Sequence, residues 1–235
     1  MNIEANTGSE LKKKLADTDI SVPARTDGRT NDHIERWVIY RTLATLLADC
    51  QIEFPVQLMK RERPDYLLNM GGREIGCEIT EAINSEYLKA KSLPEARAEA
   101  SVVDVSLFKW GAAKKKLEKL REIASRKQLT GTGWAGNSVE KEYADIVFDV
   151  AKKKTKKMTK VGYQKYQENY LLIYLNQSLP ILNQRESATI CAERLAGYWS
   201  EESFDSIFVE KGEHIAVYSS SGFKVLPLND IWKND

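Results

Sequence analysis

The sequence is poor in the residues that build disulfide frameworks and zinc sites. It has three cysteines and two histidines in 235 residues. Cys50, Cys77 and Cys191 are odd in number and lie far apart, and neither histidine stands at a zinc-site spacing from them. We therefore expect reduced thiols that mostly fill the core, and neither a disulfide scaffold nor a structural zinc site.

Long apolar runs are also missing. A membrane-spanning helix needs a run of about 18 or more apolar residues, and the first residues are charged, unlike a secretion signal. We expect a cytoplasmic protein that does not enter a membrane. With 42% hydrophobic residues, the chain can bury a sizeable core. Residues 1–30, with a short helix at Leu11–Asp17, are expected to form an N-terminal arm before one elaborated domain at 31–235.

Charge is distributed unevenly along the chain. The net charge is +1, but residues 109–165 hold 16 Lys and Arg against 6 Asp and Glu, a net +10, whereas the remainder holds 19 against 28, a net −9. Such a basic segment suits a polyanion, and the candidate nucleic-acid-binding residues are Lys114, Lys115, Lys116 and Lys153. A solvated helix surface has the same composition, so charge alone does not choose between the two interpretations.

Apolar periodicity predicts an α/β protein. Helices are expected from Asn31 or Asp32 to about Asp49, from Ser138 to about Lys160, and around 187–199. Strands are expected at 54–58, 64–70, 73–80, 170–175, 206–210 and 214–219. Residues 82–137 between them are interpreted as a mostly helical insertion, with a basic helix near 111–127 and a glycine-rich loop at 130–137.

Two carboxylates are expected to face each other across a hairpin. If Gly71-Gly72 forms a two-residue turn, Asp65 lies opposite Glu78. Like charges directly opposite each other on neighbouring strands repel each other, and a cation between them removes the repulsion. Oxygen ligands favour magnesium or manganese. A register shift of one residue would separate the pair, leaving Asp65 as a turn residue and Glu78 as an edge-strand residue.

These residues resemble the PD-(D/E)xK, or restriction-endonuclease-like, nuclease family. Pro64-Asp65, a hairpin and Glu78-Ile79-Thr80 are similar to its motif, and the expected elements over 31–176 follow its αβββαβ order, with 82–137 inserted. The resemblance implies a central mixed sheet flanked by helices. It also implies a magnesium-dependent endonuclease that hydrolyses phosphodiester bonds, with DNA as the expected substrate and a role in restriction or antiviral defence.

The resemblance also implies roles for individual residues. Asp65, Glu78 and the carbonyl of Ile79 would hold the metal ion, and Glu35 in the first helix would add another acid. The lysine of the family motif is replaced by Thr80, which has no charge to position water or to stabilise the phosphate.

The helix that begins at Ser138 offers two replacement lysines, because its inward stripe is apolar and then reaches two amines: Val139, Tyr143, Ile146, Val147, Val150, Lys154, Lys157 and Val161. Lys157 is nearer the centre of the stripe and is the first choice, with Lys154 second. The alternative is that the last turn of this helix simply leaves the core.

Because Thr80 carries no positive charge, a second interpretation is a catalytically inactive protein of the same fold that binds nucleic acid or a partner protein. A third interpretation is an interaction subunit whose basic helix at 109–127 docks on an acidic protein surface. A homodimer and a partner protein from a defence system are both compatible with the sequence.

Overall fold

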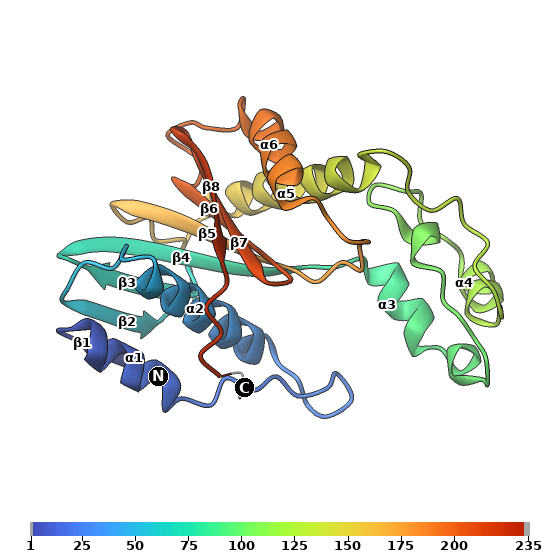
Figure 1. Cartoon of the computed structure of the whole chain (residues 1–235), viewed down its shortest axis with the longest axis horizontal. Helices are drawn as coiled ribbons and strands as arrows, with labels where there is room; N and C mark the ends of the chain where they lie inside the picture. The colour runs from blue at the N-terminus through green and yellow to red at the C-terminus, as the bar shows by residue number, and fades with distance from the viewer. Residues whose placement is uncertain (1, 233–235) are drawn as a thin grey trace.

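The structure, a computed structural model, describes residues 2–232 and contains one open, mixed sheet of eight strands that lie side by side in chain order (Figure 1). The strands are β1 (Asn2–Ala5), β2 (Val56–Lys60), β3 (Tyr66–Met70), β4 (Arg73–Ala82), β5 (Glu168–Leu175), β6 (Ser206–Lys211), β7 (His214–Ser219) and β8 (Gly222–Pro227). β5 is parallel to both of its neighbours, β4 and β6, and every other pair is antiparallel. The expected α/β class and central mixed sheet are confirmed.

Helices cover both faces of this sheet. They are α1 (Gly8–Ala16), α2 (Asn31–Ala48), α3 (Ser85–Ser92), α4 (Leu117–Ala124), α5 (Ser138–Met158) and α6 (Gln184–Leu195), with short 3₁₀ turns η1 (Pro94–Arg97) and η2 (Val105–Phe108). α1 and α2 share one apolar core with the sheet, and α5 and α6 share a second core on the opposite face. None of the described helices is long and apolar enough to cross a membrane.

Strand alternation in β4 directs its two faces to different cores. Ile75, Cys77 and Ile79 are buried in the core that contains α2, so the residues between them face the α5 side. Glu78 lies on that side and contacts α5. The predicted separation of the acid from the apolar set is confirmed.

The insertion forms a lobe beyond the end of β4, built around α3 and α4 (Figure 1). Its own small core consists of Ala90, Phe108, Leu120 and Ile123. The basic helix predicted at 111–127 is shorter than expected, because α4 covers only Leu117–Ala124. Two features keep the preceding residues out of a helix: Gly111 has a φ of 76°, and the backbone N–H of Lys115 donates to the Glu86 carboxylate at 2.7 Å.

The two ends of the sheet differ most from the sequence-based prediction. The segment expected to be an N-terminal arm contributes β1, which pairs with β2, and α1, whose Leu11 and Leu15 are fully buried. β8 was not predicted, since only Leu226 is buried in it and an alternating pattern is absent. α6 starts and ends a few residues before the predicted 187–199.

Candidate functional site

The site lies where β3 ends and β4 continues alone. β3 pairs with β4 only as far as Tyr66 and Cys77, whereas β4 pairs with β5 through Ala82. The last part of β4 therefore has a free edge on the β3 side. Main-chain groups alternate in direction along a strand, and Ile79 directs its N–H toward this edge, where it donates to Asp65 Oδ2 at 2.6 Å.

The predicted register of the acid pair is confirmed. Met70 pairs with Arg73 and Tyr66 with Cys77, so Asp65, one residue before β3, lies at the level of Glu78. The two carboxylates are close enough for the charge of Glu78 to raise the pKa of Asp65. The hairpin turn therefore sets the position of both acids.

Lys154 of α5 completes this group. Its Nζ lies 2.6 Å from Glu78 Oε1 and donates to the Ile79 carbonyl at 3.1 Å. Both side chains are largely buried, 12% exposed for Lys154 and 9% for Glu78. One amine thus bridges a carboxylate and a main-chain oxygen that the sequence analysis had assigned to a metal ion.

Lys157, the first choice from the sequence, lies farther from the acids than Lys154. It lines the same cleft, and its pKa is lowered chiefly by the neighbouring charge of Lys154 and then by burial, against the opposing charges of Glu78 and Asp65. The expected inward stripe ends before its last member, because α5 ends at Met158 and Val161 is 99% exposed. Of these two lysines, Lys154 is therefore the one that contacts the acid pair directly, through Glu78.

Asp65 is the most perturbed acid of the site. Burial, the charge of Glu78 and the charge of Glu35 raise its pKa to about 7, and the hydrogen bond from Ile79 and the charge of Lys154 only partly offset them. Glu35, on α2, also lines the cleft but is ion-paired with Lys60. Three acids thus gather here, and Asp65 has no ion-pair partner among the residues that the structure describes.

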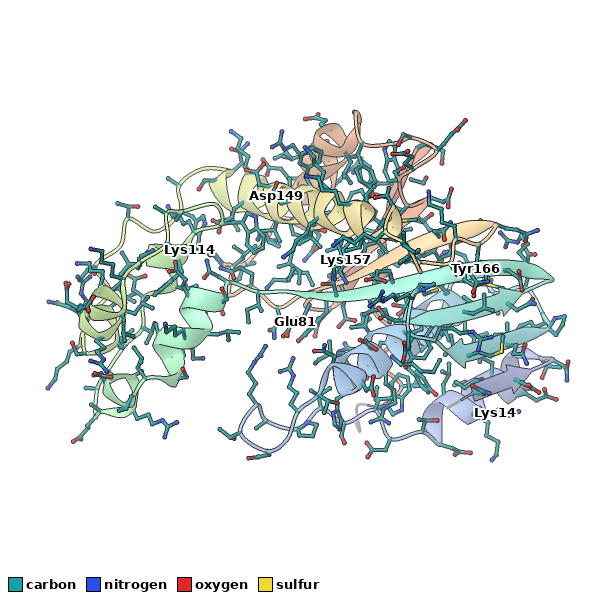
Figure 2. The ribbon with its side chains drawn as sticks, turned by 180° about the vertical axis from the view of Figure 1, so that it is seen from behind. Lys14, Glu81, Lys114, Asp149, Lys157 and Tyr166 are labelled. Atoms are coloured by element: carbon teal, nitrogen blue, oxygen red, sulfur yellow. The ribbon has the colours of Figure 1, made fainter. Side chains whose placement is uncertain are left out.

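A cleft of about 730 Å³ opens over this group. The acids that line it come from α2, the 62–65 loop, β4 and α5: Glu35, Glu62, Asp65, Glu78, Glu81 and Asp149. The basic residues that line it come from the same loop, from α5 and from the turn after α5: Arg63, Lys153, Lys154, Lys157 and Lys160. Figure 2 shows Lys157 and Glu81, two of the cleft residues, in the middle of the molecule. Glu81 is engaged by Arg25 at 2.8 Å and Arg29 at 2.9 Å.

Of the four lysines expected to bind nucleic acid, only Lys153 lines the cleft. Lys114, Lys115 and Lys116 belong to the lobe, with Lys114 labelled there in Figure 2. The amine of Lys115 lies 4.9 Å from the centre of the Phe108 ring. The structure therefore separates the basic stretch of the sequence into a cleft wall and a lobe surface.

Among the cleft residues that the sequence analysis did not single out are two aromatic ones, Trp110 and Tyr163. Trp110 lies in the insertion and is joined to α5, because its backbone N–H donates to Glu142 at 2.7 Å. Tyr163 lies in the irregular segment after α5. Neither has a local sequence pattern that marks it, since both reach the cleft through long-range packing.

A metal ion held entirely by side chains is not indicated. Within residues 2–232, no three His, Cys, Asp or Glu side chains are arranged so that they could hold one. A divalent ion here would take two carboxylates, Asp65 and Glu78, with the Ile79 carbonyl and water.

Comparisons with protein-family models, with curated proteins and with solved structures gave no match for this chain.

Proposed function

We propose that this protein is a magnesium- or manganese-dependent nuclease of the PD-(D/E)xK type that hydrolyses phosphodiester bonds in DNA. The observation that carries the proposal is the acid pair at the free edge of β4, with the Lys154 amine on both Glu78 and the Ile79 carbonyl. The succession α2, β2, β3, β4, α5 and β5 gives the αβββαβ order that the resemblance requires. A role in restriction or antiviral defence rests on the resemblance alone.

The donor set fits a hard divalent ion. Glu78 and the Ile79 carbonyl already share one cation, the Lys154 amine, so their oxygens converge on a common point. Asp65 is a partly buried acid beside them, and burial together with the charges of Glu78 and Glu35 raises its pKa. Magnesium keeps several water ligands, so two carboxylates and a carbonyl suffice. A bound ion would polarise the phosphate and lower the pKa of water.

The chain supplies the remaining functions. Lys154 takes the place of the motif lysine that Thr80 lacks, because its amine stands beside Glu78, where it can donate to the attacking water or to a phosphate oxygen. In hydrolysis the water oxygen bonds to phosphorus, the bond to the leaving oxygen breaks, and that oxygen takes up a proton. The lysines that line the cleft attract the phosphate backbone, and this attraction weakens as salt rises.

The direct test is cleavage of labelled single- and double-stranded DNA, with RNA as a comparison, in magnesium, manganese or EDTA. We expect cleavage only with a divalent ion, and its loss in Asp65→Asn, which keeps an oxygen for the Ile79 N–H. Lys156→Ala is the matched control, since Lys156 does not line the cleft. Wild-type protein that cleaves no DNA in either metal would contradict the proposal, and preferential cleavage of RNA would correct its substrate.

A second function is favoured by one feature of the same site. Lys154 is paired with Glu78 and the Ile79 carbonyl, so in a catalytically inactive protein of this fold the amine could stand permanently in place of an ion. Such a protein would bind nucleic acid or a partner protein. It is distinguished by salt-sensitive binding of DNA without cleavage in either metal.

A further inference from the structure

One side chain of the cleft has a hydroxyl without a hydrogen-bond partner in the described part of the chain. The Tyr163 oxygen is buried, yet it has no hydrogen-bond partner among the described residues. The ring lines the cleft with Asp65 and Glu78. Burial, and then the charges of Glu78 and Asp65, raise the pKa of the Tyr163 hydroxyl, so this hydroxyl stays protonated. Buried polar groups are almost always paired, and this donor therefore lacks an acceptor that something else must provide.

The position of Tyr163 is fixed by the backbone around it. The N–H of Gln164, the next residue, donates to the carbonyl of Arg63 at 3.2 Å. Arg63 belongs to the loop that carries Asp65, so the segment after α5 is joined to the acid loop. The Tyr163 ring therefore extends from a backbone position next to the site.

Neither neighbouring carboxylate accepts a hydrogen bond from this hydroxyl. Asp65 Oδ2 receives the Ile79 N–H, and Glu78 Oε1 receives the Lys154 amine. Lys157 stands in the same cleft, close enough to feel the charges of Lys154, Glu78 and Asp65. No ion pair or hydrogen bond of its amine is present in the described part of the chain. One neutral and one charged donor are therefore left free beside the acid pair.

We propose that the Tyr163 hydroxyl and the Lys157 amine form an oxyanion subsite that binds a phosphate group next to Asp65 and Glu78. Two donors suit the non-bridging oxygens of a phosphate, and a lysine amine is a common phosphate ligand. A metal ion does not fit between them, since the protonated amine of Lys157 has no lone pair to offer and repels a cation. The subsite rests on the proposed function for its biological ligand, a phosphodiester, and it adds Lys157 to Lys154 as a second lysine that can contact the phosphate.

The test uses inorganic phosphate as the probe and isothermal titration calorimetry of the full chain at low salt without divalent ions. Tyr163→Phe removes only the unpartnered hydroxyl and should weaken phosphate binding by about tenfold, as expected for a hydrogen bond to a charged group. Lys157→Met should weaken it by about tenfold or more and flatten its salt dependence. Tyr166→Phe and Lys156→Met are the matched controls outside the cleft, and neither should change the affinity.

The outcomes separate this subsite from the nuclease proposal. Absence of phosphate binding by the wild type, or equal binding by wild type and Tyr163→Phe, overturns the subsite even if the protein cleaves DNA. The expected pattern of phosphate binding without any cleavage supports the subsite and removes the nuclease activity. In a wild type that cleaves, Tyr163→Phe should lower turnover while Tyr166→Phe should not.

Discussion

Two groups of acids in this protein resemble each other in charge but differ in access. Asp65 and Glu78 lie together at the free edge of β4, where Lys154 pairs with Glu78. On the α2 face, Arg41 lies 3.1 Å from Glu210 Oε1 and 3.3 Å from Asp230 Oδ2. Burial and the charge of Asp230 raise the pKa of Glu210 to about 7 despite the opposing charge of Arg41, the same value that Asp65 reaches.

The comparison shows that a perturbed carboxyl does not by itself mark a functional site. Neither Arg41, Glu210 nor Asp230 lines the cleft, and Arg41 is 7% exposed and Glu210 3%. That group joins α2, β6 and the C-terminal segment, which is a structural task. Arg41 Nε and Glu210 Oε2 are unpaired as well, so the Asp65 group differs in opening to a cleft and a free strand edge. Access, added to a shifted pKa, indicates function.

The largest expected effect is on the stability contributed by Arg41, Glu210 and Asp230, which we call the closed group because none of them lines the cleft. Arg41→Met leaves Glu210 and Asp230 buried without their cation and should lower the free energy of unfolding by about 3–5 kcal/mol at pH 8. Lys154→Met should cost less, because water in the cleft can solvate the acids that it leaves. Urea denaturation of both variants measures the difference. Equal losses would contradict the distinction between the two groups.

The next effect is on DNA cleavage, where Lys154→Met should be more damaging than Arg41→Met. Lys154→Met should reduce DNA cleavage by about a hundredfold or more, since it removes one preorganised charge at the reacting phosphate. Arg41→Met, where it remains folded, should retain its turnover because Arg41 does not line the cleft. Single-turnover cleavage at low temperature separates activity from stability. Full turnover in Lys154→Met would remove this amine from the mechanism.

The smallest effect is a pH dependence of stability. The folded pKa of Asp65 is about 7, raised above an unfolded value of about 3.9. The folded state therefore binds this proton more tightly, and the contribution to stability that is present at acid pH is lost as pH rises through 7. In EDTA, Asp65→Asn should stabilise the protein more at pH 8 than at pH 5, by about 1–2 kcal/mol. Chemical denaturation at both pH values tests this, with the exposed Glu201→Gln as control. A gain that is independent of pH would mean that Asp65 is not buried in a charged environment.

The sequence predicted the parts of the site that local rules determine. A two-residue Gly71-Gly72 turn sets the register of Asp65 and Glu78, and strong periodicity marks α2 and α5. The structure brings Lys154, and not Lys157, into contact with Glu78, which periodicity did not predict because it does not tell where a helix leaves the core, and Val161 is already in solvent.

Other features depend on contacts that no local pattern encodes. The unpaired hydroxyl of Tyr163 exists only because the segment after α5 packs against the loop of Arg63. β1 is also difficult to recognise, since it has four residues, of which only Ile3 and Ala5 are buried.

The central claim is that Asp65 and Glu78 hold a divalent ion, and manganese binding followed by electron paramagnetic resonance tests it most directly. Wild-type protein should remove about one Mn²⁺ per chain from solution, because the acid pair and the Ile79 carbonyl provide one site. Asp65→Asn and Glu78→Gln should each abolish this binding, whereas Glu210→Gln, from the closed group, should preserve it. Manganese binding that is unchanged in Asp65→Asn, or absent from the wild type, would contradict the account.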